Sequence, residues 1–530
     1  MGMCAIQSEG ELISIALALL GARSGPTDPE RACTHGRRPC RNELMVRTVR
    51  HAILSGGDPL GEAFAGLRSA HIRRAYGATY TPEPIIEAML TWARNQCSPS
   101  RIVDPGAGSG RFLVAASQCF PNAQLVGIEV DPVAALMLRA NLAVHGLHQR
   151  ASVIVQDYRS ASLGAHTGTT LFVGNPPYVR HHGIPENWKQ WLGRTAAHYG
   201  VKASKLAGLH IHFFVRTLQL GKPGDWGVFV TSAEWLDVNY GATLRHLLAD
   251  GLGGIALHVL DPTVRPFADA ATTGAITCFR IGCRPDTLRI REVKSLQDLK
   301  DLQGGRSIPW NSAAIQKRWS VLIRPNRPVA PGSIELGEVF RVHRGQVTGN
   351  NRVWIAGRYN EDLPESVLVP SVTKARELFA AGESLTDATR LCRVVDLPAN
   401  LDEIADEDRP VVKRFLQWAR QQGADQSYIA RHRRPWWSVR LREPAPILCT
   451  YMARRPPAFV RNLCAARHLN IAHGLYPRQS LAESVLNVLA TWLRTHVKLQ
   501  GGRVYAGGLT KFEPRELERV AIPRLESLPQ

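Results

Sequence analysis

The sequence predicts an α/β protein, in which a Rossmann-like domain with a mostly parallel, twisted sheet flanked by helices precedes a C-terminal domain of mixed α+β structure. Three observations predict it. Short apolar runs alternate with helical segments across residues 101–236. A glycine-rich turn follows the first apolar run. From about residue 334 the regular alternation is replaced by a region of mixed character that becomes rich in arginine, which is typical of a second domain.

The composition indicates a multidomain protein that binds a polyanion. The chain has 530 residues, enough for two to four domains of ordinary size. No apolar run approaches the length of a membrane span, so we expect a cytoplasmic protein without membrane contact. A net charge of +20 favours nucleic acid as the partner. The ten cysteines form no CxxC pair, which indicates free thiols and no metal site.

The first unit of the alternation is a strand, a glycine-rich turn and a helix. In "SRIVDPGAGSGRFLVAASQCF" the apolar run ends at Val103, the turn covers residues 104–110, and residues 111–120 have helical composition. The three glycines of the turn let a ligand approach the backbone closely at a helix N-terminus. We therefore expect a binding loop between this strand and this helix.

The second strand–helix pair of the alternation carries an acid at the spacing that ribose binding requires. "QLVGIEV" is predicted to be a strand that ends near Glu129, and residues 131–146 are predicted to be a helix. Glu129 lies 19 residues after Gly110. In doubly wound folds, an acid about 20 residues beyond the glycine turn, at the end of the second strand, binds the ribose hydroxyls.

Two further predicted strands also end in polar residues. "ASVIVQ" is followed by Asp157, and "TLFVG" is followed by Asn175. Four successive strand ends therefore carry Asp104, Glu129, Asp157 and Asn175. Because ligands of open parallel sheets bind in the crevice outside the carboxyl ends of the strands, we expect these four side chains to surround one site.

The residues after the fourth strand are Asn175-Pro176-Pro177-Tyr178. Two consecutive prolines remove two backbone donors and stiffen the chain between an amide and an aromatic ring. A tight turn leaving the sheet would also account for Asn and Pro at this place. A nicotinamide site has no evident use for this group, and the carboxylate of Asp104 suits an ammonium group better than a pyrophosphate.

Taken in order, these motifs resemble those of the gamma-class (TaqI-type) DNA adenine-N6 methyltransferases of restriction–modification systems, which are S-adenosylmethionine-dependent enzymes. The matching segments are "YGATYTPEPIIEAML" (76–90), "DPGAGSG", "GIEVDP", "VQDY", "GNPPYV" and residues 209–236. Residues 340–354 and 507–514 resemble parts of the family's target-recognition region. The resemblance covers residues 76–283 well and the remainder more loosely.

The resemblance implies a role for each matching residue. S-adenosyl-L-methionine would be bound by Tyr80, Thr81, Pro82, Asp104, Gly106, Gly108, Glu129 and Asp157. The catalytic residues would be Asn175, Pro176, Pro177, Tyr178 and Phe213. Asn175 and the Pro176 carbonyl would accept the two N6 hydrogens of a flipped adenine, while Tyr178 stacks on the base and Phe213 touches it from the side.

The segment 428–478 has the densest positive charge. It holds ten arginines against the single acid Glu443, with aromatic residues interleaved. Arginine suits phosphates and guanine edges, although several of these side chains would lose that role if they paired with acids elsewhere. The predicted DNA-binding residues are Arg431, Arg433, Arg434, Trp436, Arg440, Arg454, Arg455 and Arg461.

The expected domains are a helical extension (1–75), a catalytic domain (76–283), a linker (284–333) and a target-recognition domain (334–530). The expected partners are double-stranded DNA and a separately encoded restriction endonuclease, with the chain acting as a monomer. Two alternatives stay open at this point. A protein glutamine-N5 methyltransferase also uses the Asn-Pro-Pro-Tyr group, and a recognition subunit would bind DNA and cofactor without turnover.

Overall fold

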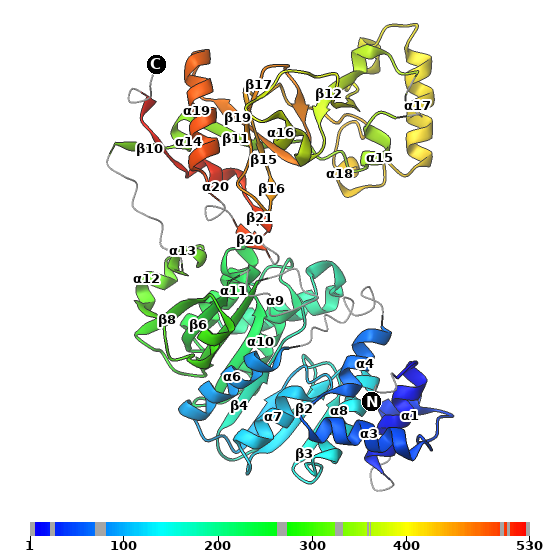
Figure 1. Ribbon diagram of the computed structural model, residues 1–530, viewed down its shortest axis with the longest axis vertical. Coiled ribbons are helices and arrows are strands. Elements are labelled where there is room, and N and C mark those ends of the chain that lie inside the picture. Colours follow the sequence, from blue (N-terminus) through cyan, green and yellow to red (C-terminus); the bar gives the residue numbers. More distant parts are fainter. Residues whose placement is uncertain are drawn as a thin grey trace. The chain divides into compact units, whose positions relative to one another are not determined.

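The structure is a computed structural model with two compact units, residues 1–326 and 327–530 (Figure 1). It describes residues 6–21, 27–68, 81–261, 273–323, 332–357, 360, 362–498, 503–505 and 509–525. Within these ranges, no helix combines the length and apolar character that crossing a membrane requires.

A nine-stranded sheet forms the centre of the first unit. Its strands are β1 (Arg101–Asp104), β2 (Gln124–Glu129), β3 (Ala151–Val155), β4 (Thr170–Gly174), β5 (Trp226–Ser232), β6 (Gly254–Leu260), β7 (Gly274–Arg280), β8 (Thr287–Val293) and β9 (Arg306–Pro309). Their order in the sheet is β3-β2-β1-β4-β5-β7-β6-β8-β9. The first five are mutually parallel, whereas β7 is antiparallel to both of its neighbours. The mixed, mainly parallel sheet agrees with the predicted fold class.

Helices cover both faces of this sheet, because successive side chains of a strand point to opposite faces. On β1, Ile102 and Val103 are both buried but belong to different apolar clusters. The helices of this unit after the N-terminal segment are α6 (Glu83–Gln96), α7 (Arg111–Cys119), α8 (Pro132–Val144), α9 (Glu186–His198), α10 (Leu209–Leu220), α11 (Ala242–Ala249), α12 (Trp310–Ala314) and α13 (Ser320–Ile323). Helices α6 and α7 pack on one face of the sheet, and α10 and α11 pack on the other.

Four strand ends meet at one edge of the sheet, because β1, β2, β3 and β4 all run in the same direction. Asp104 and Glu129 are the last residues of β1 and β2. Asp157 follows β3 by two residues, and Asn175 directly follows β4. The fold therefore brings the four polar side chains of the sequence pattern to the same edge.

The predicted linker over residues 284–333 is wrong for most of its length. Strand β8 pairs in parallel with β6, and β9 pairs with β8. Leu288, Ile290 and Trp310 are buried in the same apolar cluster as the central strands. These residues extend the catalytic sheet, and the boundary between the units falls at residue 326.

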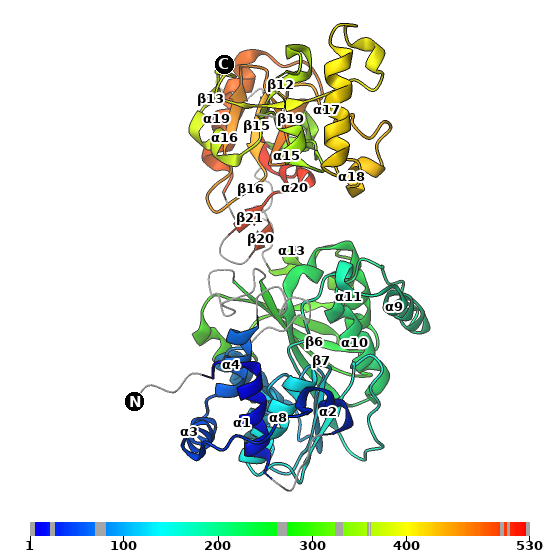
Figure 2. The same cartoon turned by 90° about the vertical axis from the view of Figure 1, so that its right-hand side faces the viewer.

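In the described part of the N-terminal segment lie the helices α1 (Glu9–Leu20), α2 (Asp28–Thr34), α3 (Glu43–Leu54) and α4 (Pro59–Leu67). Figure 2 shows α1 beside α8. Leu12, Ile15 and Ala16 of α1 are fully buried in a cluster that also contains Leu136 and Ala140 of α8. Because Leu138 and Leu142 of α8 face the sheet, α8 is packed on two sides and joins the N-terminal helices to the sheet.

The second unit is built around a five-stranded sheet of order β11-β19-β15-β17-β13. Its helices are α14 (Leu336–Val339), α15 (Asn351–Trp354), α16 (Ala375–Ala381), α17 (Arg409–Gln421), α18 (Tyr428–Arg431), α19 (Glu483–His496) and α20 (Pro514–Glu518). Its strands are β10 (Ser333–Glu335), β11 (Phe340–Arg344), β12 (Leu368–Val372), β13 (Ser384–Leu385), β14 (Cys392–Val395), β15 (Ile447–Thr450), β16 (Met452–Ala453), β17 (Phe459–Asn462), β18 (Arg467–His468), β19 (Ala472–Pro477), β20 (Arg503–Tyr505), β21 (Leu509–Lys511) and β22 (Ala521–Pro523). Helix α19 packs on one face of the five-stranded sheet and α16 on the other, so this unit has its own α+β core.

A buried ion pair ties α2 to α8, and its removal tests how firmly the N-terminal helices are anchored. Glu30 is fully buried and pairs with Arg139. We expect Glu30→Ala to lower the free energy of unfolding by about 3–5 kcal/mol, because it removes the buried carboxylate that pairs with Arg139. Chemical denaturation measures this. The matched control is Asp28→Ala, which removes the exposed pair with Arg31 and costs at most about 1 kcal/mol. Equal losses in both variants would contradict this anchoring role.

Candidate active site

A single cavity of about 360 Å³ lies at the sheet edge where the four strand ends meet. Its wall includes the glycine turn, the residues after β2 and β3, the catalytic motif after β4, and part of α4 and α10. The predicted site residues that line it are Thr81, Gly106, Gly108, Glu129, Asp157, Asn175, Pro177 and Phe213. The structure thus brings most of the predicted site together around one space.

Asp104, the last residue of β1, is 1% exposed and does not itself line this cavity. Its Oδ1 accepts the N–H of Gly106 at 3.3 Å. Its Oδ2 is buried and has no hydrogen-bond partner among the residues that the structure describes. Burial is the main cause that raises the pKa of Asp104 to about 8, with the Gly106 N–H opposing it and the Glu129 carboxylate adding to it. An unpaired buried carboxylate of this kind suits a cationic ligand group.

Two glycines lie close to Asp104 and to the Asn175–Tyr178 group. A Cβ added to Gly174 would lie 2.5 Å from Asp104 Oδ1, so only glycine fits at the end of β4. A Cβ added to Gly106 would lie 3.7 Å from Pro177 and 3.8 Å from Phe213. The glycine turn therefore approaches the catalytic motif at van der Waals distance, which brings any ligand on the turn close to Asn175.

Glu129 is held by backbone donors in this structure. Its Oε2 accepts the N–H of Gly108 at 2.8 Å, and its Oε1 accepts those of Val130 and Asp131, each at 2.9 Å. Burial raises the pKa of Glu129, while these N–H groups act in the opposite direction. The carboxylate is thereby placed at the cavity wall beside the glycine turn, where a ribose diol would replace part of this hydrogen bonding.

Asp157 has a partner that the sequence analysis missed. Arg159 donates from its backbone N–H and from Nε to Asp157 Oδ1, each at 2.9 Å, and from a terminal nitrogen to Oδ2 at 2.5 Å. The Arg159 guanidinium is also stacked 4.1 Å over the ring of Trp188 in α9. Since both contacts hold the guanidinium, Arg159 orients the Asp157 carboxylate. The only sequence signal was a basic residue two positions after the acid.

Asn175 is oriented by the segment that precedes α6. Its amide nitrogen donates to the Thr81 hydroxyl at 3.0 Å, and the Thr81 carbonyl accepts from Arg111 at 2.9 Å. Because the Asn175 nitrogen is used in this bond, its Oδ1 is the acceptor end of the amide. Pro176 and Pro177 stiffen the chain directly behind it.

Phe213 of α10 stands against the residue after Asp157. Its ring centroid lies 5.0 Å from that of Tyr158, and the Tyr158 hydroxyl is hydrogen-bonded to Thr217 at 2.9 Å. Burial raises the pKa of Tyr158. The aromatic pair forms a fixed apolar wall beside the catalytic motif.

The remaining predicted residues differ in position. Tyr80 lies outside the described residues. Pro82 precedes α6 as its N-cap. Tyr178 is half-buried, and burial raises the pKa of its hydroxyl. Neither Pro82 nor Tyr178 belongs to the cavity wall as the structure has it.

Three of the eight residues predicted to contact DNA are structural in the second unit. Arg461 is 4% exposed and pairs with Glu483 and Asn487. Arg433 donates to the backbone carbonyls of Val347 and Thr348. Trp436 packs in the apolar cluster around Trp354. Arg461 is thus enclosed by the fold, whereas Arg433 and Trp436 are half-buried and held by these contacts. The exposed members are Arg431, Arg434, Arg440, Arg454 and Arg455.

The pKa of Asp104 predicts how stability depends on pH. The folded protein keeps a proton on Asp104 up to about pH 8, whereas the carboxyl of an exposed Asp has a pKa of 3.8. Because the folded-state pKa is raised, the stability that this proton contributes is lost as the pH rises through about 8. We expect the free energy of unfolding of the wild type, minus that of Asp104→Asn, to fall by about 1 kcal/mol per pH unit between pH 6 and 8. Urea unfolding at several pH values measures it, and a constant difference would contradict the protonated state of Asp104.

Comparisons with known proteins agree with this arrangement. Residues 58–228 match the N-6 DNA Methylase family, and residues 310–530 match the C-terminal domain of type II methyltransferase M.Eco57I. The type II methyltransferase M.XamI of Xanthomonas campestris pv. amaranthicola is 52% identical, with 99% of each chain covered. The type II methyltransferase M.AccI of Acinetobacter calcoaceticus is 21% identical, with 90% of each chain covered.

A solved structure supports the fold. The DrdV–DNA complex, studied by cryo-electron microscopy, matches with a TM-score of 0.55 at 12% identity, over 90% of this chain and 59% of that chain. At this identity the match concerns the fold alone. The relationship to M.XamI, in contrast, is close and extends over nearly all of both sequences. The chain therefore belongs to the type II DNA methyltransferases of restriction–modification systems, with a catalytic region of the N-6 DNA methylase family.

Proposed function

We propose that this chain is a site-specific adenine DNA methyltransferase, which transfers a methyl group from S-adenosyl-L-methionine to N6 of an adenine flipped out of duplex DNA. One observation carries the proposal. A single cavity joins the glycine turn and Glu129 to Asn175 of the Asn-Pro-Pro-Tyr group. The cofactor site and the amide that activates an amino group are therefore parts of one space.

The residues present fit the cofactor. The unpaired, buried Oδ2 of Asp104 suits the ammonium of the methionine part. Glu129 would accept the ribose hydroxyls, and Asp157, held by Arg159, would accept the amino group of the cofactor adenine. Thr81 lies on the cavity wall beside Asn175. When bound, S-adenosyl-L-methionine supplies a methyl group on a sulfonium sulfur and leaves as S-adenosyl-L-homocysteine.

Asn175 and Pro176 would make N6 of the target adenine a nucleophile. The lone pair of N6 is delocalised into the ring, so the free amine is a poor nucleophile. The Asn175 Oδ1 and the Pro176 carbonyl would each accept one N6 hydrogen, which favours a pyramidal nitrogen with a localised lone pair. That lone pair would then be available to the methyl group that the cofactor supplies, and the extra N6 proton would go to solvent. Because the prolines and Thr81 hold both acceptors before the reaction, no reorganisation is needed.

The target base needs an aromatic environment outside the duplex. Tyr178 would stack on the flipped adenine, and Phe213, fixed against Tyr158, would contact its edge. Stacking of this kind contributes roughly 1–3 kcal/mol per base, similar to the cost of removing a base from the stack. Stacking in the site would therefore offset the free energy needed to remove the target base from the duplex stack.

The second unit would select the DNA sequence. Its five exposed arginines of the predicted set lie in a segment rich in positive charge, and such side chains suit phosphates and guanine edges. We also propose double-stranded DNA as the substrate, a separately encoded restriction endonuclease as the cognate partner, and action as a monomer.

The two alternative functions account for fewer of these observations. A protein glutamine-N5 methyltransferase or a non-catalytic recognition subunit would share the cofactor cavity. However, the identity with a type II methyltransferase extends over the second unit as well, and Asp104, Glu129, Asp157 and Asn175 are all present around the cavity. Incubation with tritiated cofactor and plasmid DNA, followed by digestion to nucleosides, distinguishes the three.

Asn175→Ala should abolish most methyl transfer and leave cofactor binding intact. The substitution removes one preorganised acceptor, which costs on the order of 10²–10³ in turnover number, while Glu129 and the glycine turn are untouched. A methylation assay measures the rate, and calorimetric titration with S-adenosyl-L-methionine is the control. Turnover close to that of the wild type would disprove the role assigned to Asn175.

Exposed arginines of the second unit should behave differently inside and outside the segment 428–478. We expect Arg434→Ala and Arg454→Ala to weaken DNA binding, and each lost phosphate contact to reduce the slope of log affinity against log salt by about 0.9. Fluorescence anisotropy with a labelled duplex at several salt concentrations measures this. Arg390→Ala is the matched control, because Arg390 is also exposed on the same unit but lies outside the segment. If Arg390→Ala has the same effect, the charge acts through the whole surface and not through this segment.

A further inference from the structure

The N-terminal helix α4 presents one face to the cavity. Gly61, Phe64, Ala65 and Arg68 all contribute to the cavity wall. Their spacing of three, four and seven residues places them on one side of a helix, with Arg68 directly after its last turn. Gly61 and Ala65 are small, so the face projects mainly through the Phe64 ring and the Arg68 guanidinium.

Both ends of α4 are attached to residues of the cofactor site. Asp58, the N-cap of α4, accepts a hydrogen bond from the hydroxyl of Ser109 in the glycine turn. Asn141 of α8 donates to the Ser109 carbonyl at 2.8 Å and to Asp58 at 3.4 Å. The start of α4 is thus joined to the turn that holds the cofactor.

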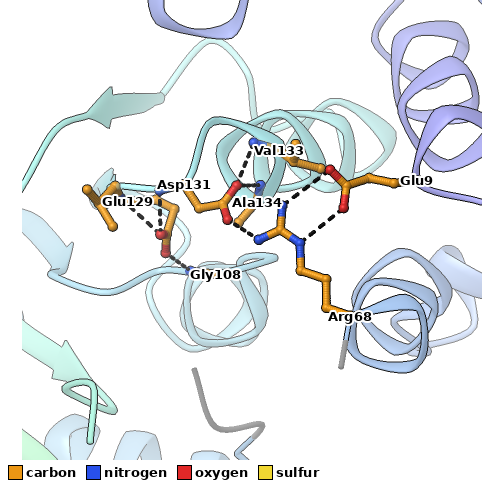
Figure 3. A network of polar contacts seen from close by, with 8 residues as sticks. Glu9, Arg68, Gly108, Glu129, Asp131, Val133 and Ala134 are labelled. Carbon is orange, nitrogen blue, oxygen red and sulfur yellow. Dashed lines mark hydrogen bonds and ion pairs between the residues drawn. The ribbon is translucent and has the colours of Figure 1, made fainter. Parts of the chain in front are cut away.

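At the other end, Arg68 forms an ion pair with Asp131 and another with Glu9 of α1. Figure 3 shows the Arg68 guanidinium between these two carboxylates, with Glu129 on the far side of Asp131. Asp131 also caps α8 through the N–H groups of Val133 and Ala134. Since two acids neutralise its charge, Arg68 acts as a structural brace at the end of the cavity where Glu129 lies.

Phe64 is placed by this brace. The Arg68 guanidinium carbon lies 4.1 Å from the centre of the Phe64 ring. The ring is half-buried against the apolar cluster of α1 and α8, and it also lines the cavity. An aromatic face is therefore held at the ribose end of the site.

We propose that Phe64 is a cofactor-contact residue whose ring packs against the adenosyl part of bound S-adenosyl-L-methionine, and that Arg68 is the residue that positions it. The N-terminal helices thereby complete the cofactor site in addition to covering α8. This inference rests on the proposed function, because it takes S-adenosyl-L-methionine as the occupant of the cavity.

The test is calorimetric titration of the full-length protein with S-adenosyl-L-methionine. Phe64→Ala should weaken binding about tenfold or more, since stacking on a base contributes roughly 1–3 kcal/mol. Phe64→Trp should bind within about threefold of the wild type, because the aromatic face is retained. Leu44→Ala is the matched control, because Leu44 is 76% exposed on α3 of the same helical segment and away from the cavity. It should bind as the wild type does.

Arg68→Met should raise KM for S-adenosyl-L-methionine about tenfold while kcat stays within about twofold, since the reacting groups are not touched. Arg68→Lys should restore part of this loss, because it keeps one ion pair. A fall in kcat with KM unchanged would contradict the positioning role.

Further results would show whether the inference about Phe64 or the proposed function itself is wrong. If Phe64→Ala lowers the melting temperature strongly, Phe64→Leu keeps the buried apolar contact without a ring face and should still weaken binding. If Phe64→Ala or Phe64→Leu binds the cofactor as tightly as the wild type, the inference about Phe64 is wrong and the proposed function is unaffected. If the wild type itself fails to bind S-adenosyl-L-methionine, the proposed function fails.

Discussion

The burial of one carboxylate, Asp104, is the constraint on which the rest of the site depends. The side chain is enclosed at the end of β1, and its neighbour at the end of β4 must be Gly174 because a Cβ there would lie 2.5 Å from the carboxylate. The next residue is Asn175, so the same close approach that encloses the acid also places the Asn175 amide. A buried carboxylate without a full set of partners is unfavourable, and this cost is offset either by the proton that the raised pKa of Asp104 retains or by a cation beside it.

Helix α8 connects the parts of the first unit. One side packs on the sheet through Leu138 and Leu142, and the other packs on the N-terminal helices through Leu136 and Ala140. Its N-cap, Asp131, is two residues from Glu129 and forms the ion pair with Arg68. A displacement of the N-terminal helices would therefore change the wall of the cofactor site directly. For this reason the N-terminal segment is part of the catalytic unit.

In the second unit, the number of arginines and the positions of their side chains support different conclusions about DNA binding. The excess of arginine indicates a polyanionic partner, but it does not tell which side chains are available. Arg461 is enclosed by Glu483, Asn487 and a backbone carbonyl, where it satisfies acceptors of the fold itself. Arg454, seven residues before it along the chain, is exposed, as is Arg434. Local sequence does not separate these cases, because the partners of Arg461 come from α19 and from the residue before β15.

The sequence by itself determined the first four strands, the helices after the glycine turn and the second strand, and the four polar strand ends, because these depend on apolar periodicity and on residues close together in the chain. It also determined the Asn-Pro-Pro-Tyr group and the likeness to DNA methyltransferases. Only the tertiary structure decided that residues 287–309 extend the sheet, because β8 joins it by pairing with β6 and with β9. Only the tertiary structure also decided that Arg159 orients Asp157, that Arg461 is buried, and that Phe64 and Arg68 reach the cavity. Each of these features depends on contacts between segments distant in sequence or on the local path of the backbone. The spacing of apolar residues in the sequence predicts neither.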